Sequence, residues 1–136
     1  MIDYIIKRSD GFLEVSDNNR VTILNQAILG YLNQLAFPYF RTIPTILTIT
    51  RKRLKCTQKV PIYIHSKLIL LQIEPLRAKT SLLINYSAIA QIIYNTENYY
   101  TISFKSGAIL KCSQHQVINK QMKYAIKLID LLEINQ

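Results

Sequence analysis

The chain has 136 residues, enough for one domain with its own hydrophobic core, and its hydrophobic content of 49% excludes a disordered chain. Seventeen Lys and Arg residues against eight Asp and Glu residues give a net charge of +9, which favours an anionic partner.

The first third of the chain is expected to hold two short strands and a helix. Residues 2–7 and 12–15 have strand-like patterns on either side of a turn at residues 9–11 (Ser-Asp-Gly). A second turn is expected at residues 17–19 (Asp-Asn-Asn). Residues 22–36 carry apolar side chains every three or four positions, which predicts an amphipathic helix.

The segment 45–55 has an ambiguous pattern. Its β-branched residues favour a strand. In contrast, Pro44 suits the first turn of a helix, and the bases at the end of the segment suit a helix C-terminus. We expect a helix here, after a connection at residues 37–44.

The second half is expected to form a largely antiparallel sheet closed by a helix. Strands are expected at residues 60–64, 67–73, 81–86, 88–94, 99–105 and 108–112. Residues 113–116 (Ser-Gln-His-Gln) have the spacing of a capping box, and a helical apolar stripe follows from Ile118 to Leu132. The predicted fold class is therefore α+β, with a mainly antiparallel sheet, a helix in the N-terminal half and a C-terminal helix, in a single domain over residues 1–136.

No motif in the sequence indicates catalysis, a cofactor or a metal centre. The carboxylates show no pair at a spacing that suggests a shared site, and there is no Gly-rich phosphate loop or nucleophile elbow. A metal site built from Cys56, Cys112, His65 and His115 would have to form through space, since their spacing does not match a metal motif. Each cysteine is better interpreted as a small buried apolar residue. We expect no enzyme, no cofactor and no metal.

The sequence also favours a cytoplasmic protein without a membrane partner. Two cysteines are too few for a disulfide framework, which fits a reducing compartment. No secretory leader is visible at the start, and no apolar run reaches the roughly 20 residues of a membrane span.

The basic residues are concentrated in the middle of the chain. Nine of them lie between residues 41 and 79 together with one acid, Glu74, so that this stretch carries +8 (nine minus one) of the total of +9. Because like charges repel one another in a folded protein, such a cluster favours an external anion, with nucleic acid as the first candidate. The predicted DNA-binding residues are Arg41, Arg51, Lys52, Arg53, Lys55, Lys59, Lys67, Arg77 and Lys79.

Two kinds of contact are expected from these residues. The bases within residues 51–55 are dense enough to meet several phosphates. Arginine suits a narrow minor groove, so Arg41, Arg51, Arg53 and Arg77 are the candidates for sequence preference. An ordinary solvated face, an RNA target and a protein-interaction module that binds an acidic partner remain as alternatives.

Short motifs follow one another along the second half of the chain. They are Lys59-Val-Pro61-Ile62-Tyr-Ile64, the apolar run Leu68 to Pro75, Arg77-Ala-Lys79, Ser81-Leu-Leu-Ile84-Asn85 with Ile89, Thr101-Ile-Ser-Phe104-Lys-Ser-Gly107, and Ile118-Asn-Lys-Gln121 with Ala125. In this order they resemble the competence transcription factor family ComK of Gram-positive bacteria. The expected helix at 22–36 and Tyr39-Phe-Arg41 stand in the place of that family's Gly-Arg region.

The resemblance implies a cytoplasmic DNA-binding activator of competence genes. Such a protein would recognise AT-rich promoter sites in double-stranded DNA, work as a homo-oligomer, and contact RNA polymerase and a proteolytic adaptor. Residues 77–85 are also similar to the Arg-x-His-Arg-Ser-x-x-Val-Asn segment of LytTR-type response-regulator domains. Because both families bind DNA, either resemblance implies transcription regulation.

Overall fold

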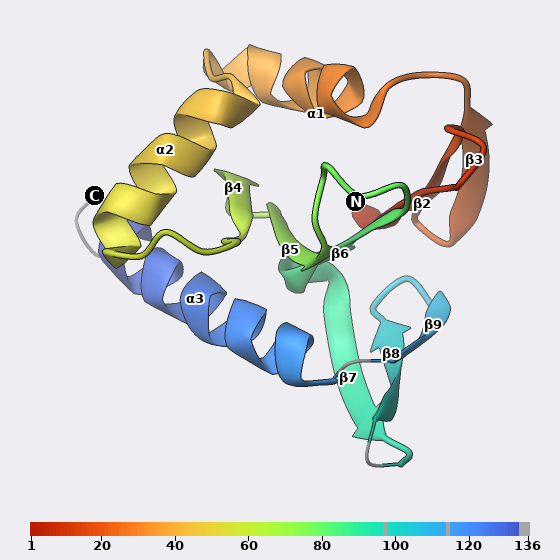
Figure 1. Cartoon of the computed structure of the whole chain (residues 1–136). Coiled ribbons are helices and arrows are strands. Elements are labelled where there is room, and N and C mark those ends of the chain that lie inside the picture. The colour runs from red at the N-terminus through yellow and green to blue at the C-terminus, as the bar shows by residue number, and fades with distance from the viewer. Residues whose placement is uncertain (97, 114, 134–136) are drawn as a thin grey trace.

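The computed structural model describes residues 1–96, 98–113 and 115–133. Strands and helices alternate in groups along this part of the chain, in an α+β arrangement (Figure 1). Their order is β1 (Ile2–Lys7), β2 (Leu13–Asp17), β3 (Arg20–Leu24), α1 (Ile28–Ala36), the 3-10 turn η1 (Phe37–Tyr39), α2 (Ile43–Leu54), β4 (Ile62–His65), β5 (Leu68–Glu74), β6 (Ser81–Asn85), the 3-10 turn η2 (Tyr86–Ala88), β7 (Ile89–Tyr94), β8 (Tyr99–Phe104), β9 (Ile109–Ser113) and α3 (His115–Glu133).

The described strands form two antiparallel sheets rather than one. The larger sheet has the order β3-β2-β1-β6-β5-β4, in which two three-stranded meanders join through the pairing of β1 with β6. The smaller sheet has the order β7-β8-β9. The chain leaves the large sheet at η2, which is capped by the side chain of Asn85. This single turn of 3-10 helix separates two strands that the sequence pattern placed in one sheet.

Asn85 belongs to both family resemblances, and its role here is structural. The side chain is fully buried. Its Nδ2 donates to the carbonyl oxygens of Ile2 (2.7 Å) and Lys67 (2.9 Å), and its Oδ1 accepts from the backbone N–H groups of Ile69 (3.0 Å) and Ser87 (3.2 Å). One amide therefore ties β1, β5, β6 and η2 together, because a buried polar group must find its partners within the fold.

The centre of the large sheet is buried on both faces, whereas its edge strand β3 is exposed. Strand β5 demonstrates this, because its residues alternate between two hydrophobic clusters. Leu68 and Leu70 join the cluster with α1 and α2, whereas Ile69, Leu71 and Ile73 join the cluster with α3 and the small sheet. The molecule therefore has α1 and α2 on one face of the central sheet, and α3 with β7–β9 on the other (Figure 1).

The helix expected at residues 22–36 begins only at Ile28, and residues 20–24 form strand β3 instead. The reason lies in the preceding turn. Asn18 and Asn19 both have positive φ, 52° and 65°, and Asp17 pairs with Arg20 across a two-residue loop. Two consecutive left-handed Asn residues are typical of a tight β-hairpin, so the chain returns along β2 before the helix starts.

The other two helices agree with the sequence predictions. Helix α2 forms where the pattern was ambiguous: Thr42 is the extended N-cap residue, a proline follows in the first turn, and Ile43, Ile46 and Leu54 are buried. Tertiary packing therefore outweighs the strand preference of the β-branched residues. Helix α3 begins at His115. The predicted capping box includes residue 114, which lies outside the described residues. None of the helices in the described ranges has both the length and the hydropathy that a bilayer span requires.

Candidate functional site

The C-terminal end of α2 gathers basic side chains into one turn. Arg51, Lys52 and Arg53 occupy its last turn, where the partial negative charge of the helix C-terminus favours cations. The helix ends at Lys55, which has the left-handed conformation (φ 54°). The N–H of Cys56 donates to the carbonyl oxygen of Arg51 (3.1 Å), which satisfies one of the last helical acceptors.

Two buried glutamines fix the loop that follows α2. The backbone N–H of Gln72 on β5 donates to Oε1 of Gln121 on α3 (3.0 Å), and Nε2 of Gln121 donates to the carbonyl oxygen of Lys59 (2.9 Å). Nε2 of Gln72 donates to the carbonyl oxygen of Val60 (2.7 Å). Their exposed fractions are 3% for Gln72 and 2% for Gln121. Because each amide is buried and paired, the loop is held against β5 and α3 in one position.

An open groove of about 1020 Å³ lies between α1, α2, the α2–β4 loop and the β5–β6 loop. We call it the basic groove, because five cationic residues line it: Arg51, Lys52, Lys55, Lys59 and Arg77. Its floor is apolar and includes Ile28, Leu47 and Leu76. None of the described residues that line it is acidic.

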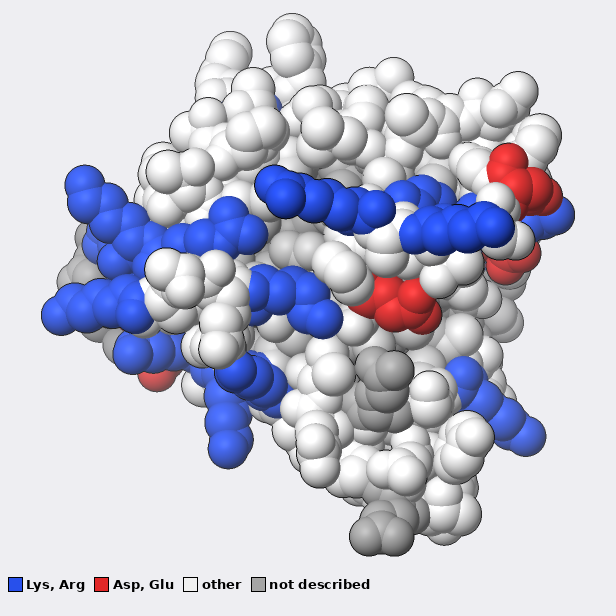
Figure 2. All heavy atoms as spheres, in the orientation of Figure 1, with Lys and Arg blue, Asp and Glu red and all other residues white. Residues whose placement is uncertain are grey.

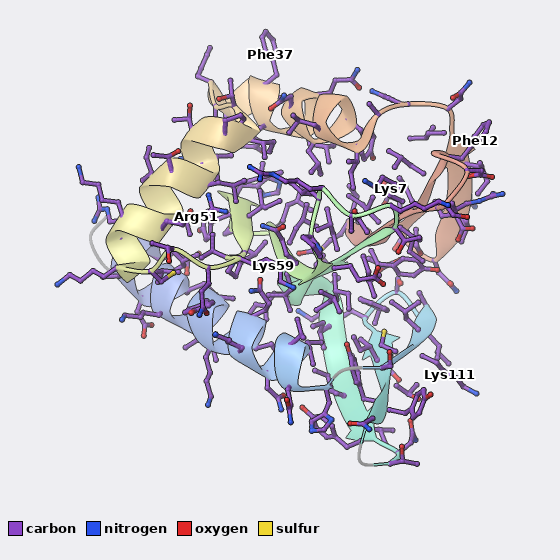
Figure 3. All side chains as sticks on the ribbon, viewed as in Figure 1. Lys7, Phe12, Phe37, Arg51, Lys59 and Lys111 are labelled. Atoms are coloured by element: carbon purple, nitrogen blue, oxygen red, sulfur yellow. The ribbon has the colours of Figure 1, made fainter. Side chains whose placement is uncertain are left out.

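The cations of this region share one face of the molecule. Lys and Arg side chains gather over the C-terminal end of α2 and the adjacent part of α3, and they continue as a band across the middle of the face (Figure 2). Arg51 and Lys59 lie near each other on this face, with Lys7 further along it, whereas Lys111 extends from the opposite end of the molecule (Figure 3).

Within the described residues, the cations of the basic groove form no ion pair. Of the carboxylates in the described residues, none lies within 4.0 Å of a basic nitrogen of the five lining cations. Lys59 is half-buried, and its Nζ donates to the carbonyl oxygen of Ile73 (3.0 Å). Burial lowers the pKa of the Lys59 ammonium, and the nearby carboxylate of Glu74 acts in the opposite direction.

Two further cations lie near the groove but outside the sequence window of residues 41–79. Nζ of Lys7 on β1 donates to the carbonyl oxygen of Leu76 (2.9 Å), a residue that lines the groove. Lys120 on α3 donates to the side chain of Gln58, next to Lys59. A charge count along the chain cannot find them, because β1 and α3 reach this place only through the fold. The Ile118-Asn-Lys-Gln121 motif was the one sequence signal that included Lys120.

The remaining predicted residues do not line the basic groove. Nη1 of Arg41 donates to the carbonyl oxygen of Ile64 (3.3 Å) at the end of β4, and Lys67 lies in the β4–β5 turn. Arg53 is exposed on α2, and Lys79 is exposed in the β5–β6 loop. Of the nine predicted contacts, the structure therefore brings together five around one cavity and leaves four outside its lining.

The residues that could have formed a metal site lie apart. His65 stacks on Tyr39 (4.9 Å between ring centroids), and His115 packs edge-on against Tyr94 (6.1 Å). Cys112 is buried, and its burial raises the pKa of the thiol to about 11. In the part of the chain that the structure describes, no three His, Cys, Asp or Glu residues are grouped so that they could hold a metal ion.

Comparison of the chain with protein-family models, with curated proteins and with solved structures gives no match. The function therefore has to be argued from the basic groove and its charges.

Proposed function

We propose that this chain binds double-stranded DNA through the basic groove and its rim, and acts as a transcription regulator. One observation carries the proposal: five cations converge on one groove with no carboxylate within 4.0 Å among the described residues. Crowded cations raise the free energy of the folded chain unless an anion neutralises them. A duplex backbone supplies such anions at regular spacing, and the release of its counterions drives binding.

The two resemblances found in the sequence supply the finer proposal. Both ComK and LytTR domains bind DNA, and the ComK resemblance covers more of this chain. We take AT-rich promoter DNA as the target, activation of competence genes in the cytoplasm as the role, and a homo-oligomer as the active form. The proposed contacts with RNA polymerase and a proteolytic adaptor come from the same resemblance.

The fold narrows the candidates for sequence preference among the arginines. Arg51 and Arg77 line the basic groove, whereas Arg41 is turned toward Ile64. The Nε of Arg51 donates to the carbonyl oxygen of Gln58 (3.2 Å), which directs the guanidinium along the α2–β4 loop. We therefore assign phosphate contacts to the five lining cations, and an additional minor-groove contact to Arg51 or Arg77.

The test is a mobility-shift titration of an AT-rich duplex over a series of salt concentrations. If about five phosphates are neutralised, log affinity should fall against log salt with a slope near −4 to −5. Replacing Arg51, Lys52, Lys55 and Arg77 with Gln should bring the slope to about −1, because each lost contact removes about 0.9.

A matched variant replaces four cations outside the groove and outside the predicted DNA-binding set with Gln: Arg8, Arg20, Lys105 and Lys111. Both variants have the same net charge of +5 (nine minus four). The control should keep most of the wild-type slope. Equal losses in both variants would show that overall charge, and not the groove, attracts DNA. Equal binding of AT-rich DNA, GC-rich DNA and polyglutamate would favour an acidic protein partner instead.

A further inference from the structure

The floor of the basic groove is not explained by DNA binding. A phosphate backbone needs cations and hydrogen-bond donors, but not a concave apolar surface. The groove nevertheless has apolar walls from α1, α2 and the β5–β6 loop. Its volume of about 1020 Å³ is at the upper end of the range of small-molecule sites, which is roughly 300–1000 Å³.

Two polar side chains of the groove lining are already engaged within the protein. Nε2 of Gln72 donates to Val60, and the hydroxyl of Thr48 donates to the carbonyl oxygen of Pro44 (2.9 Å). A ligand on the floor would therefore meet mainly apolar contacts, while its charged end would meet the cations at the rim. This excludes a strongly polar ligand, because its hydrogen-bonding groups would lose water without gaining partners.

The groove is also held in place before anything binds. The pair of buried glutamines fixes its loop wall, and Lys7 donates to Leu76 in the opposite wall. A preformed wall lowers the entropy cost of binding a small molecule. Lys59 is half-buried, and it lines the groove together with the other four cations. Its aliphatic chain can therefore contact an apolar ligand while its ammonium group contacts an anion.

We propose that the basic groove binds a small amphipathic anion, with an apolar body on Leu47 and Leu76 and one carboxylate or phosphate between Arg51 and Lys59. The chemistry of the lining selects this class. An anion is attracted by five cations with no lining acid, and an apolar body covers the floor. A second copy of the chain fits less well, because each copy brings a net charge of +9.

Occupancy of the groove would also regulate the protein, a consequence that rests on the proposed DNA-binding function. The anionic group would neutralise the same cations that hold the duplex. Binding of the small anion and binding of DNA should therefore be antagonistic, and each should weaken the other by the same factor.

The test of the site uses decanoate and the full chain in the absence of DNA. Calorimetric titration should show saturable binding at one site, and decanol and decyltrimethylammonium should bind at least tenfold more weakly. Arg51→Gln and Leu76→Gln should each weaken decanoate binding at least tenfold. Ile109→Gln is the matched control, because Ile109 is an exposed apolar residue on β9 and is not part of the groove lining.

The two proposals can fail separately. If decanoate does not saturate, or if Leu76→Gln and Ile109→Gln have equal effects, the ligand site is wrong whatever the chain does with DNA. If the site is confirmed and no duplex binds, the DNA-binding proposal is wrong. When both bind, decanoate should displace DNA from the wild type but not from Leu76→Gln, which should keep its DNA affinity within about twofold. Failure to displace DNA from the wild type would overturn the regulatory consequence.

Discussion

The N-terminal hairpin and the basic groove differ in the surroundings of their cationic side chains. In the β1–β2 hairpin, Arg8 contacts the carboxylates of Asp10 (2.7 Å) and Glu14 (4.0 Å), and its guanidinium lies over the ring of Phe12 (6.0 Å). In the basic groove, no described carboxylate lies within 4.0 Å of a basic nitrogen of the five lining cations. The same kind of side chain is thus neutralised locally in one region and left exposed to an outside partner in the other.

This contrast separates the residues that stabilise the fold from the residues that are available to a partner. Exposed ion pairs contribute little to stability, about 0–1 kcal/mol, so Arg8 is a modest surface feature. The groove cations favour folding even less, because they repel one another. The groove is instead stabilised by the buried amides of Gln72 and Gln121, which hold the α2–β4 loop against β5 and α3. Three pairs of substitutions test this division, in order of decreasing effect.

The largest effect is expected at the buried amide that supports the groove. Gln121→Leu keeps most of the side-chain volume but leaves the N–H of Gln72 and the carbonyl oxygen of Lys59 without their partner. Each buried group that loses its partner costs about 1–3 kcal/mol, so the loss of two partners should lower the free energy of unfolding by about 2–6 kcal/mol. Urea denaturation followed by circular dichroism measures this change.

Gln116→Leu is the matched control, because Gln116 is exposed on the same helix. Its effect should stay within about 0.5 kcal/mol of the wild type. If Gln121→Leu were as mild as this control, the loop that carries Lys59 would have to be held by other contacts, and the division between a charged rim and a buried support would be wrong.

Much of the fold could be predicted from residue patterns, because local rules and packing agree there. Helix α3 has a long apolar stripe, and β5 begins with a continuous apolar run from Leu68 to Leu71. The fold class and most strands follow from such signals. The helix prediction was wrong at residues 22–27, because residues 22–24 belong to the edge strand β3 and the helix begins only at Ile28. The two asparagines at 18 and 19 contained the correct signal, since both have a left-handed conformation in a two-residue hairpin loop.

The site was predictable only in part, for a physical reason. A run of cations such as residues 51–55 is visible in the sequence, but the identity of its neighbours depends on long-range packing. Arg77 reaches the groove through the β5–β6 loop, and Lys7 and Lys120 come from β1 and α3. The supporting role of the buried glutamines was not predicted: Gln121 appeared only as part of a family motif, and a polar residue inside a strand or helix pattern usually indicates a solvated position. Whether the groove binds DNA stays a prediction.

A smaller effect is expected at the residue that ends α2. Lys55 has a left-handed backbone, which costs a residue with a Cβ atom about 1 kcal/mol relative to glycine. Lys55→Gly should therefore raise the free energy of unfolding by about 1 kcal/mol and weaken DNA binding, because it removes one groove cation. Lys52→Gly removes the same charge from a helical position, where glycine should lower stability by about 1 kcal/mol. If urea denaturation shows that Lys55→Gly is more stable and Lys52→Gly less stable than the wild type, the lysine at position 55 supplies a charge at a cost in stability. If both variants shift the free energy of unfolding in the same direction, this explanation is wrong.

The smallest effect compares one cation from each region directly. Arg8→Gln removes an exposed ion pair, so the free energy of unfolding should fall by about 0.2–1 kcal/mol at low salt. Arg77→Gln removes a groove cation from a loop, away from any helix terminus, and should raise it by a few tenths of a kcal/mol, because it relieves repulsion. Thermal unfolding at low salt and at about 0.5 M NaCl provides the internal control, since screening should shrink both differences. If Arg77→Gln destabilised the protein as much as Arg8→Gln does, the groove cations would have neutralising partners within the chain. The argument for an external anion would then lose its physical basis.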